Sequence, residues 1–139
     1  MSEERILRCH IGIGPRVQGT AIAARDNFSV RYDLDYNRGI FGRPGHALYG
    51  VSYVGCILVL NASKGGVASA WMLHELMTLG KAPLALVLND ANPVLVQGAA
   101  FANLPLVDRF ETDVTKEIVT GDELIVDPQA GEVRVLRVV

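Results

Sequence analysis

One segment near the middle of the chain constrains the fold more than any other, because a strand pattern, a glycine turn and a helix pattern follow one another directly. The strand pattern covers residues 53–61, the helix pattern covers residues 66–80, and a second strand pattern covers residues 83–88. Gly80 ends the helix pattern in the usual way. A strand, a helix and a strand in this order predict a right-handed βαβ unit in a parallel sheet.

The turn before this helix carries the chemistry that a ligand site needs. Gly65 and Gly66 allow positive φ and a close approach to the backbone, and the helix start directs N–H groups and a positive dipole end at the turn. Ser63, Lys64 and Ser69 add two hydroxyls and a cation. Two interpretations stay open at this point: an anion-binding site, or an ordinary tight connection between strand and helix.

The remaining patterns place strands on both sides of this unit. Asn92 is an N-cap candidate and Pro93 is suited to a first helical position, so we expect a short helix there. The ranges predicted outside the βαβ unit are strands at 5–13, 17–24, 30–34, 104–107, 123–127 and 132–138, a helix at 94–103, and a polar loop at 108–115. Together they predict one α/β domain over residues 1–139, with a central βαβ unit and a flanking β layer.

The segment from residue 29 to residue 50 shows no clear periodicity. It is rich in arginine, aspartate and tyrosine, and it contains Arg43 and His46 close to several glycines. Long irregular segments inside a compact domain are often functional. The segment is therefore either a solvated surface loop or a loop that faces a substrate or a partner.

Composition excludes several classes of function. The net charge is −2 without a basic cluster and aromatic residues make up only 6%, so we expect no nucleic-acid partner. The apolar runs are shorter than a membrane span, and the acidic start, Met1-Ser2-Glu3-Glu4-Arg5, lacks an apolar signal core. We therefore expect a cytoplasmic protein without a membrane segment.

The metal-ligating residue types are few and widely spaced. Cys9 and Cys56 lie in strand-like apolar runs, which predicts buried, reduced thiols, and two cysteines alone cannot hold an iron–sulfur cluster. The three histidines show no metal-site spacing with them. We expect no metal bound by this chain alone. Trp71 is expected in the core, and His74 with Glu75 on a solvated helix face.

The chain resembles the small subunit of the aconitase X family over roughly residues 16–136. The order and spacing of several segments carry the resemblance: Pro44-Gly45-His46-Ala47-Leu48-Tyr49-Gly50, the strand and turn through residue 83, Asn92-Pro93, Gly98-Ala99-Ala100, Leu104-Pro105-Leu106-Val107-Asp108, and Thr120-Gly121-Asp122-Glu123-Leu124-Ile125-Val126-Asp127. What the resemblance implies is a swivelling β/β/α domain.

The resemblance also implies a function as the small subunit of a hydro-lyase. Such an enzyme dehydrates a small hydroxy acid, hydroxyproline-like or phosphomevalonate-like, by removing a proton beside a carboxylate while a metal helps hydroxide leave. The large subunit is expected to carry the metal or iron–sulfur site, and the small subunit to close over it. The chain would be active only with that large subunit.

The glycine turn departs from the family pattern. The family turn usually reads Gly-Lys/Arg-Gly-Ser, and Gly66 stands at the position of the serine. The candidate catalytic residues are Ser63, Lys64 and Ser69, and the candidate substrate-binding residues are Gly65, Gly66, Arg43 and His46. The alternative is a non-catalytic anion-binding or interaction domain of the same fold.

The same turn resembles a second family, the swivelling phosphohistidine domains. Gly65, Gly66 and Ser69 match their pattern, but Ala70 stands where those domains carry the phosphorylated histidine. This difference argues against a phosphocarrier role.

Overall fold

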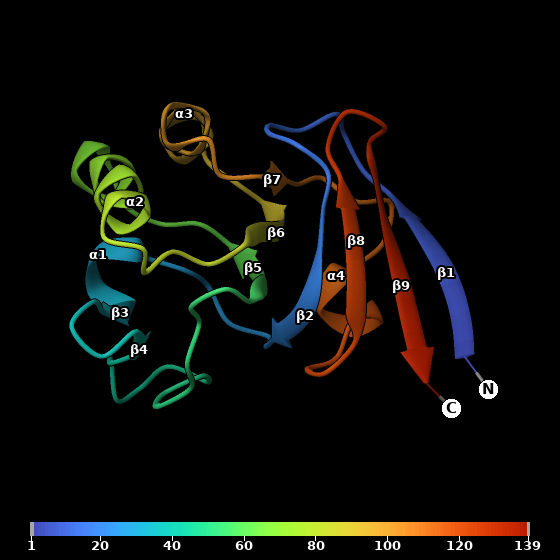
Figure 1. Ribbon diagram of the computed structural model, residues 1–139, viewed down its shortest axis with the longest axis horizontal. Coiled ribbons are helices and arrows are strands. Elements are labelled where there is room, and N and C mark those ends of the chain that lie inside the picture. The colour runs from blue at the N-terminus through green and yellow to red at the C-terminus, as the bar shows by residue number, and fades with distance from the viewer. Residues whose placement is uncertain (1, 139) are drawn as a thin grey trace.

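The computed structural model describes residues 2–138 and shows a large mixed β-sheet with helices against it (Figure 1). Met1 and Val139, which the one-domain prediction includes, lie outside the described residues, as does the start of the acidic N-terminal segment. Within residues 2–138, seven strands pair in the order β1-β9-β8-β2-β5-β6-β7. Their bounds are β1 Ser2–Arg8, β2 Val17–Ala23, β5 Ile57–Ala62, β6 Ala85–Asp90, β7 Leu106–Val107, β8 Glu123–Asp127 and β9 Glu132–Val138.

The strand β2 belongs to both halves of this sheet. Its first residues pair antiparallel with β8, as Val17 with Val126, and its last residues pair parallel with β5, as Ala21 with Ile57. On one side of β2 the strands β8, β9 and β1 are antiparallel, and on the other side β5, β6 and β7 are parallel. The parallel half contains the predicted βαβ unit, and the antiparallel half contains the predicted C-terminal hairpin.

Two hydrophobic cores separate three layers. The helices α2 (Val67–Thr78) and α3 (Pro93–Ala102) cover one face of the parallel strands, where Leu58 and Leu60 of β5 contribute to the first core. The opposite face of the same strands, with Ile57 and Val59, packs against the antiparallel strands in the second core. The one-turn helix α4 (Val114–Glu117) joins this second core, and Figure 1 shows it on the far side of the sheet from α2 and α3. The order of layers is β/β/α, as predicted.

The segment from residue 29 to residue 50 is ordered rather than an open loop. It contains the short helix α1 (Val30–Asp33) and the two-residue strands β3 (Leu34–Asp35) and β4 (Ile40–Phe41), which pair with each other. The predicted strand at 30–34 is wrong. The side chain of Ser29 accepts a hydrogen bond from the Tyr32 N–H, and the Asp33 carboxylate accepts one from the Ser29 N–H, so the caps favour a helical turn.

Other element predictions differ from the structure mainly at their ends. The helices at 66–80 and 94–103 and the hairpin strands are confirmed. The predicted strand at 53–61 starts only at Ile57, because the chain turns before it, with Gly55 at a φ of 71°. The first strand ends at Arg8 instead of residue 13. The helix α4 lies partly in the predicted loop, where Asp113 caps it.

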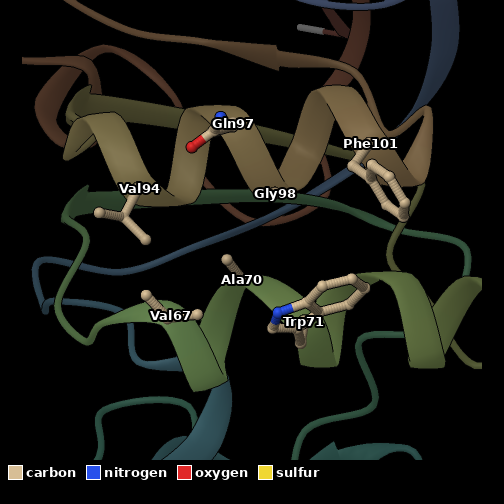
Figure 2. Close-up of a pocket in the computed structure, with 7 residues that line it drawn as sticks. All are labelled: Val67, Ala70, Trp71, Val94, Gln97, Gly98 and Phe101. Carbon is tan, nitrogen blue, oxygen red and sulfur yellow. The ribbon is translucent and has the colours of Figure 1, made fainter.

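The helices α2 and α3 approach closely because Gly98 faces Ala70. A Cβ atom on Gly98 would lie 2.7 Å from the Ala70 Cβ and 2.9 Å from its carbonyl oxygen. An apolar groove of about 270 Å³ lies between the two helices, and Figure 2 shows it with Trp71 and Phe101 at one end. The rings of these two residues meet edge to face at 5.4 Å. Trp71 is 59% exposed, so its predicted place in the core is wrong.

We expect Gly98→Val to lower the free energy of unfolding by about 2–3 kcal/mol, because the new side chain overpacks the contact with Ala70 and separates the helices. Urea unfolding measures this difference. Ala100→Val is the matched control, since Ala100 is exposed on the same helix and the change there costs only about 0.7 kcal/mol of helix propensity or less. Equal stability of the two variants would contradict the close contact between α2 and α3.

Candidate functional site

Two segments that are far apart in the sequence meet at the start of α2. The Asn61 N–H donates to the Asp26 carbonyl at 2.8 Å, and the Phe28 N–H donates to the Ala62 carbonyl at 2.9 Å. The Lys64 N–H in turn donates to the Phe28 carbonyl at 2.8 Å. Residues 26–28 therefore extend the sheet beside the end of β5 and hold the glycine turn against the segment that contains α1.

A cleft of about 380 Å³ lies where these segments meet. It brings together Arg43, Lys64 and Gly65 from the predicted site. The other residues that line it were not predicted: Asp26, Asn27, Phe28, Ser29, Tyr32 and Asp33. The cleft combines two cations with hydroxyl and carboxylate groups at the N-terminal end of α2, an arrangement that can bind an oxyanion.

The glycine turn has a geometry that requires Gly65. Its φ of 112° lies in a region that L side chains rarely adopt, and a Cβ atom there would collide with the Ser69 hydroxyl. Ser69 lies in the first turn of α2, is only 3% exposed, and has its hydroxyl directly against Gly65. Gly66 is the N-cap residue of α2 and supplies no side-chain cap. The N–H groups of the first turn therefore have no side chain over them at the cap.

Ser63 has a different role from Ser69 in this structure. Its hydroxyl accepts a hydrogen bond from the Asn92 N–H at 2.8 Å. The Asn92 side chain accepts from the Leu95 N–H as the N-cap of α3 and donates to the Gly65 carbonyl at 3.3 Å. Ser63 therefore links the glycine turn to the start of α3.

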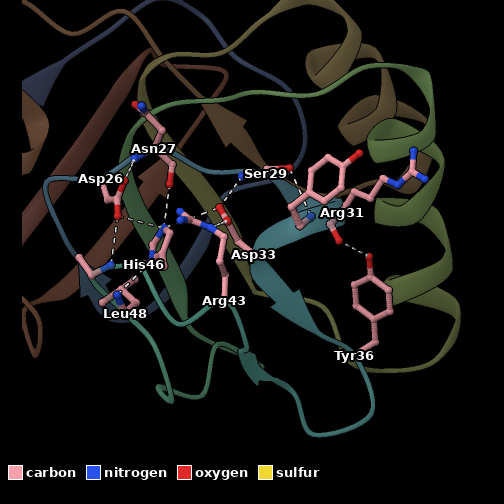
Figure 3. Close-up of polar contacts among 11 residues, drawn as sticks. Asp26, Asn27, Ser29, Arg31, Asp33, Tyr36, Arg43, His46 and Leu48 are labelled. Atoms are coloured by element: carbon pink, nitrogen blue, oxygen red, sulfur yellow. Dashed lines mark hydrogen bonds and ion pairs between the residues drawn. The ribbon is translucent and has the colours of Figure 1, made fainter.

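A polar network forms part of the cleft wall and continues behind it to His46, as Figure 3 shows. Arg43 donates to Asp33, whose side chain is 4% exposed. The side chain of His46 is fully buried, with its Nε2 atom 3.7 Å from Asp33 and 3.8 Å from Asp26. The Nε2 atom lies 2.8 Å from the Asn27 carbonyl, and Nδ1 accepts from the Leu48 N–H. These partners assign the proton to Nε2 and place His46 behind the cleft wall instead of at its surface.

The network also determines the charges at the cleft. Burial raises the pKa of Asp26, but hydrogen bonds from the N–H groups of Ala47 and Asn27 outweigh it, so the pKa lies below its usual range. The hydrogen bond to Asp33 and its negative charge raise the pKa of Arg43. In the described part of the chain, no carboxylate forms an ion pair with Lys64. Lys64 thus contributes a positive charge to the cleft, and Asp33, which pairs with Arg43, does not neutralise this charge.

The sequence held one signal for the residues that were missed. Ser29 followed by Asp33 is close to a capping box, which would have indicated a helical turn between them. Their place beside Lys64 depends on the pairing of residues 26–28 with the end of β5, and no local pattern reports such a pairing.

The metal-ligating side chains of residues 2–138 do not gather into a metal site. Among residues 2–138, no group of three or more histidine, cysteine, aspartate or glutamate side chains could hold a metal ion. Cys9 and Cys56 are both free and partly buried, and burial is the main cause that raises the pKa of Cys9 to about 11. The described residues therefore do not fit a metal centre on this chain. No helix of the described residues has the length and apolar character of a membrane span.

The layers and the position of the cleft define a class of domain. Helices on one side, a parallel sheet in the middle and an antiparallel β layer on the other side are the swivelling β/β/α architecture, with the cleft beside the first helix of the parallel half.

Comparisons with known proteins narrow this class to a family. A family model described as the aconitase X swivel domain matches residues 6–135. The phosphomevalonate dehydratase small subunit of Methanocella arvoryzae is 33% identical over 125 residues, which are 90% of this chain and 95% of the relative. The small subunit of the same name from Pyrococcus horikoshii is 32% identical and covers 90% of this chain. The chain belongs to the aconitase X swivel domain family.

Solved structures agree with this assignment. The holo-form of Thermococcus kodakaraensis aconitase X superposes with a TM-score of 0.87 at 27% identity, over 94% of this chain and 98% of that one. A UPF0107 protein solved by NMR gives a TM-score of 0.83, also at 27% identity. The resemblance stated from the sequence and the predicted fold class are confirmed.

Proposed function

We propose that the chain is the small subunit of an aconitase-X-like hydro-lyase and that it works with a separate large subunit. The observation that carries this proposal is the similarity, over nearly the full length of both chains, to relatives named phosphomevalonate dehydratase small subunit. A phosphomevalonate-like hydroxy acid is therefore the first substrate to test, with a hydroxyproline-like acid as the second. The proposed mechanism removes water by breaking a C–H bond beside a carboxylate and a C–O bond to the hydroxyl, with a double bond formed between the two carbons.

The residues of the cleft are assigned roles by their positions. Lys64 and the N-terminal end of α2, at Gly65 and Gly66, bind the carboxylate or phosphate of the substrate. Arg43 lines the same cleft. These groups hold the substrate. Because they bind its carboxylate or phosphate, they also fix the orientation of the substrate in the cleft.

Ser69 is the stronger of the two serine candidates for proton transfer. Its hydroxyl lies against Gly65 in the described structure, whereas the Ser63 hydroxyl accepts a hydrogen bond from the Asn92 N–H. A hydroxyl can move a proton in the transition state when its surroundings favour the ionised form. We propose this role for Ser69 and a structural role for Ser63.

The metal or iron–sulfur centre of the proposed enzyme belongs to the large subunit. Such a centre, when bound, supplies a Lewis acid that helps hydroxide leave. The small subunit closes over that site with its cleft facing it. His46 supports the cleft from behind instead of contacting the substrate.

Reconstitution tests the proposal. The full chain and a large subunit of an aconitase X enzyme from the same source are produced separately and together, and all three preparations are assayed for dehydration of phosphomevalonate and cis-3-hydroxyproline. We expect a stable complex with dehydratase activity, and no activity from either subunit alone. A stable complex that dehydrates neither acid would contradict the proposed reaction.

One observation favours a second function. Gly66 stands where the family turn usually has a serine, so the domain lacks that hydroxyl while it keeps the glycine turn at the start of α2. In that case the chain is a non-catalytic anion-binding or interaction domain. Binding of inorganic phosphate by the full chain, together with an inactive complex, would support this alternative.

A further inference from the structure

We propose that Asp33 is a positioning residue that fixes the Arg43 guanidinium at the wall of the cleft so that it faces the substrate oxyanion. This inference rests on the proposed function, because it adds a specific role within the same cleft. It concerns a residue that is not among the predicted site residues.

The position of Asp33 is determined on three sides. One carboxylate oxygen accepts from the Ser29 N–H at 2.7 Å, and the other accepts from the Arg43 Nε atom. The His46 ring lies 3.7 Å from the first oxygen. Since the Asp33 side chain is only 4% exposed, it cannot follow Arg43 into the solvent.

Arg43 depends on this contact for its place. Its own side chain is 42% exposed, and it extends from a loop that contains Pro44 and Gly45. A long arginine side chain at an exposed position samples many rotamers unless a partner holds it. The contact through Nε leaves the two terminal nitrogens of the guanidinium for another acceptor, as Figure 3 shows with Arg43 beside Asp33.

His46 completes the support from behind. Its ring stacks on Phe41 at 4.7 Å and is fixed by the Asn27 carbonyl and the Leu48 N–H. It thereby holds residues 26–27, α1 and the loop before Leu48 together. His46, which was predicted to bind the substrate, thus supports the cleft through its contacts with Asp33 and the residues around it.

The test compares Asp33→Asn with Asp35→Asn in the full chain. Asparagine at residue 33 has the same shape and still accepts from Ser29, but it removes the charge that holds Arg43. Asp35 is the matched control, because it pairs with Arg38 at 3.7 Å outside the cleft. The first readout is the Nε–Hε resonance of Arg43, assigned by its loss in Arg43→Lys. We expect slow exchange with water in the wild type and in Asp35→Asn, and fast exchange in Asp33→Asn.

A phosphate titration then asks whether this position matters for binding. We expect inorganic phosphate to shift the Arg43 resonance in the wild type, with an affinity about tenfold weaker in Asp33→Asn. In the Arg43→Ala background the resonance is gone, so calorimetry measures the phosphate affinity there, and adding Asp33→Asn should have no further effect because the two changes remove the same interaction. If Asp33→Asn weakens phosphate binding about tenfold in the Arg43→Ala background as well, Asp33 has a merely structural role and the proposal is overturned. Unchanged exchange of the Arg43 Nε–Hε proton in Asp33→Asn would also overturn it.

Turnover in the reconstituted complex separates this inference from the proposed function. We expect Asp33→Asn to raise KM about tenfold with kcat changed less than about twofold. If the wild-type complex has no activity, the proposed reaction fails, while the resonance and the phosphate titration still decide the role of Asp33.

Discussion

Replacing Gly65 with alanine is expected to lower kcat/KM of the reconstituted complex by at least about a hundredfold, because small displacements in a site have effects of this size. Two physical reasons coincide at this residue. Its φ of 112° disfavours any L side chain, and the added Cβ would occupy the space of the Ser69 hydroxyl. The substitution therefore displaces both the turn that binds the anion and the serine proposed to move the proton. Steady-state kinetics with phosphomevalonate measure the effect.

The control for this prediction separates backbone strain from the loss of the site. Gly55 also has a positive φ, 71°, but no atom lies within 4 Å of the position of its Cβ, and it is not part of the cleft. Gly55→Ala should cost about 1 kcal/mol of stability and leave the kinetics unchanged. If Gly65→Ala retains full activity, neither the glycine turn nor Ser69 lies at the reacting centre.

Removal of the Lys64 ammonium is expected to have the second large effect. We expect Lys64→Ala to raise KM about ten- to a hundredfold, since hydrogen bonds to charged groups contribute on this scale. Lys64 lines the cleft, and no described carboxylate neutralises it. The effect should shrink as ionic strength rises, because salt screens an exposed charge in the wild type.

Lys116→Ala is the matched control, since Lys116 is an exposed lysine in α4, on the far side of the sheet from α2. Its kinetics should equal those of the wild type. Equal KM values for Lys64→Ala and the wild type would remove Lys64 from the substrate site and leave the anion to the helix end alone.

Local patterns were sufficient to predict the elements that depend on neighbours in the sequence. Gly80 follows the end of α2, α3 starts at Asn92 and Pro93, and the C-terminal hairpin has a turn between two alternating runs. These signals are short-range, so the βαβ unit and a flanking β layer followed from them, whereas the β/β/α order of the layers was implied by the resemblance to the aconitase X family. Lys64 and Gly65, which line the cleft, were predicted as site residues in the same way, because the turn before a helix can be recognised from its own residues.

The remaining parts of the site depend on contacts between distant residues. Asp26 and Asp33 reach the cleft only because residues 26–28 pair beside β5, and the hydroxyl of Ser63 finds its partner 29 residues away, at Asn92. Trp71 was placed in the core by its apolar character, yet α2 packs on the sheet through Leu73 and Leu76 and leaves the indole exposed. The layer beneath a helix determines which face of the helix is buried. Apolar residues cover a wide arc of α2, so the sequence alone did not indicate its buried face.

The shared strand β2 has a consequence for how the domain loses its structure. Its first residues are bonded to β8 and its last residues to β5, so neither layer can detach without breaking the ladder of a strand that the other layer also needs. The two cores on either side of the parallel strands are therefore coupled through one backbone segment. Amide protons of both layers should share one opening free energy, and the domain should melt as one cooperative unit instead of layer by layer.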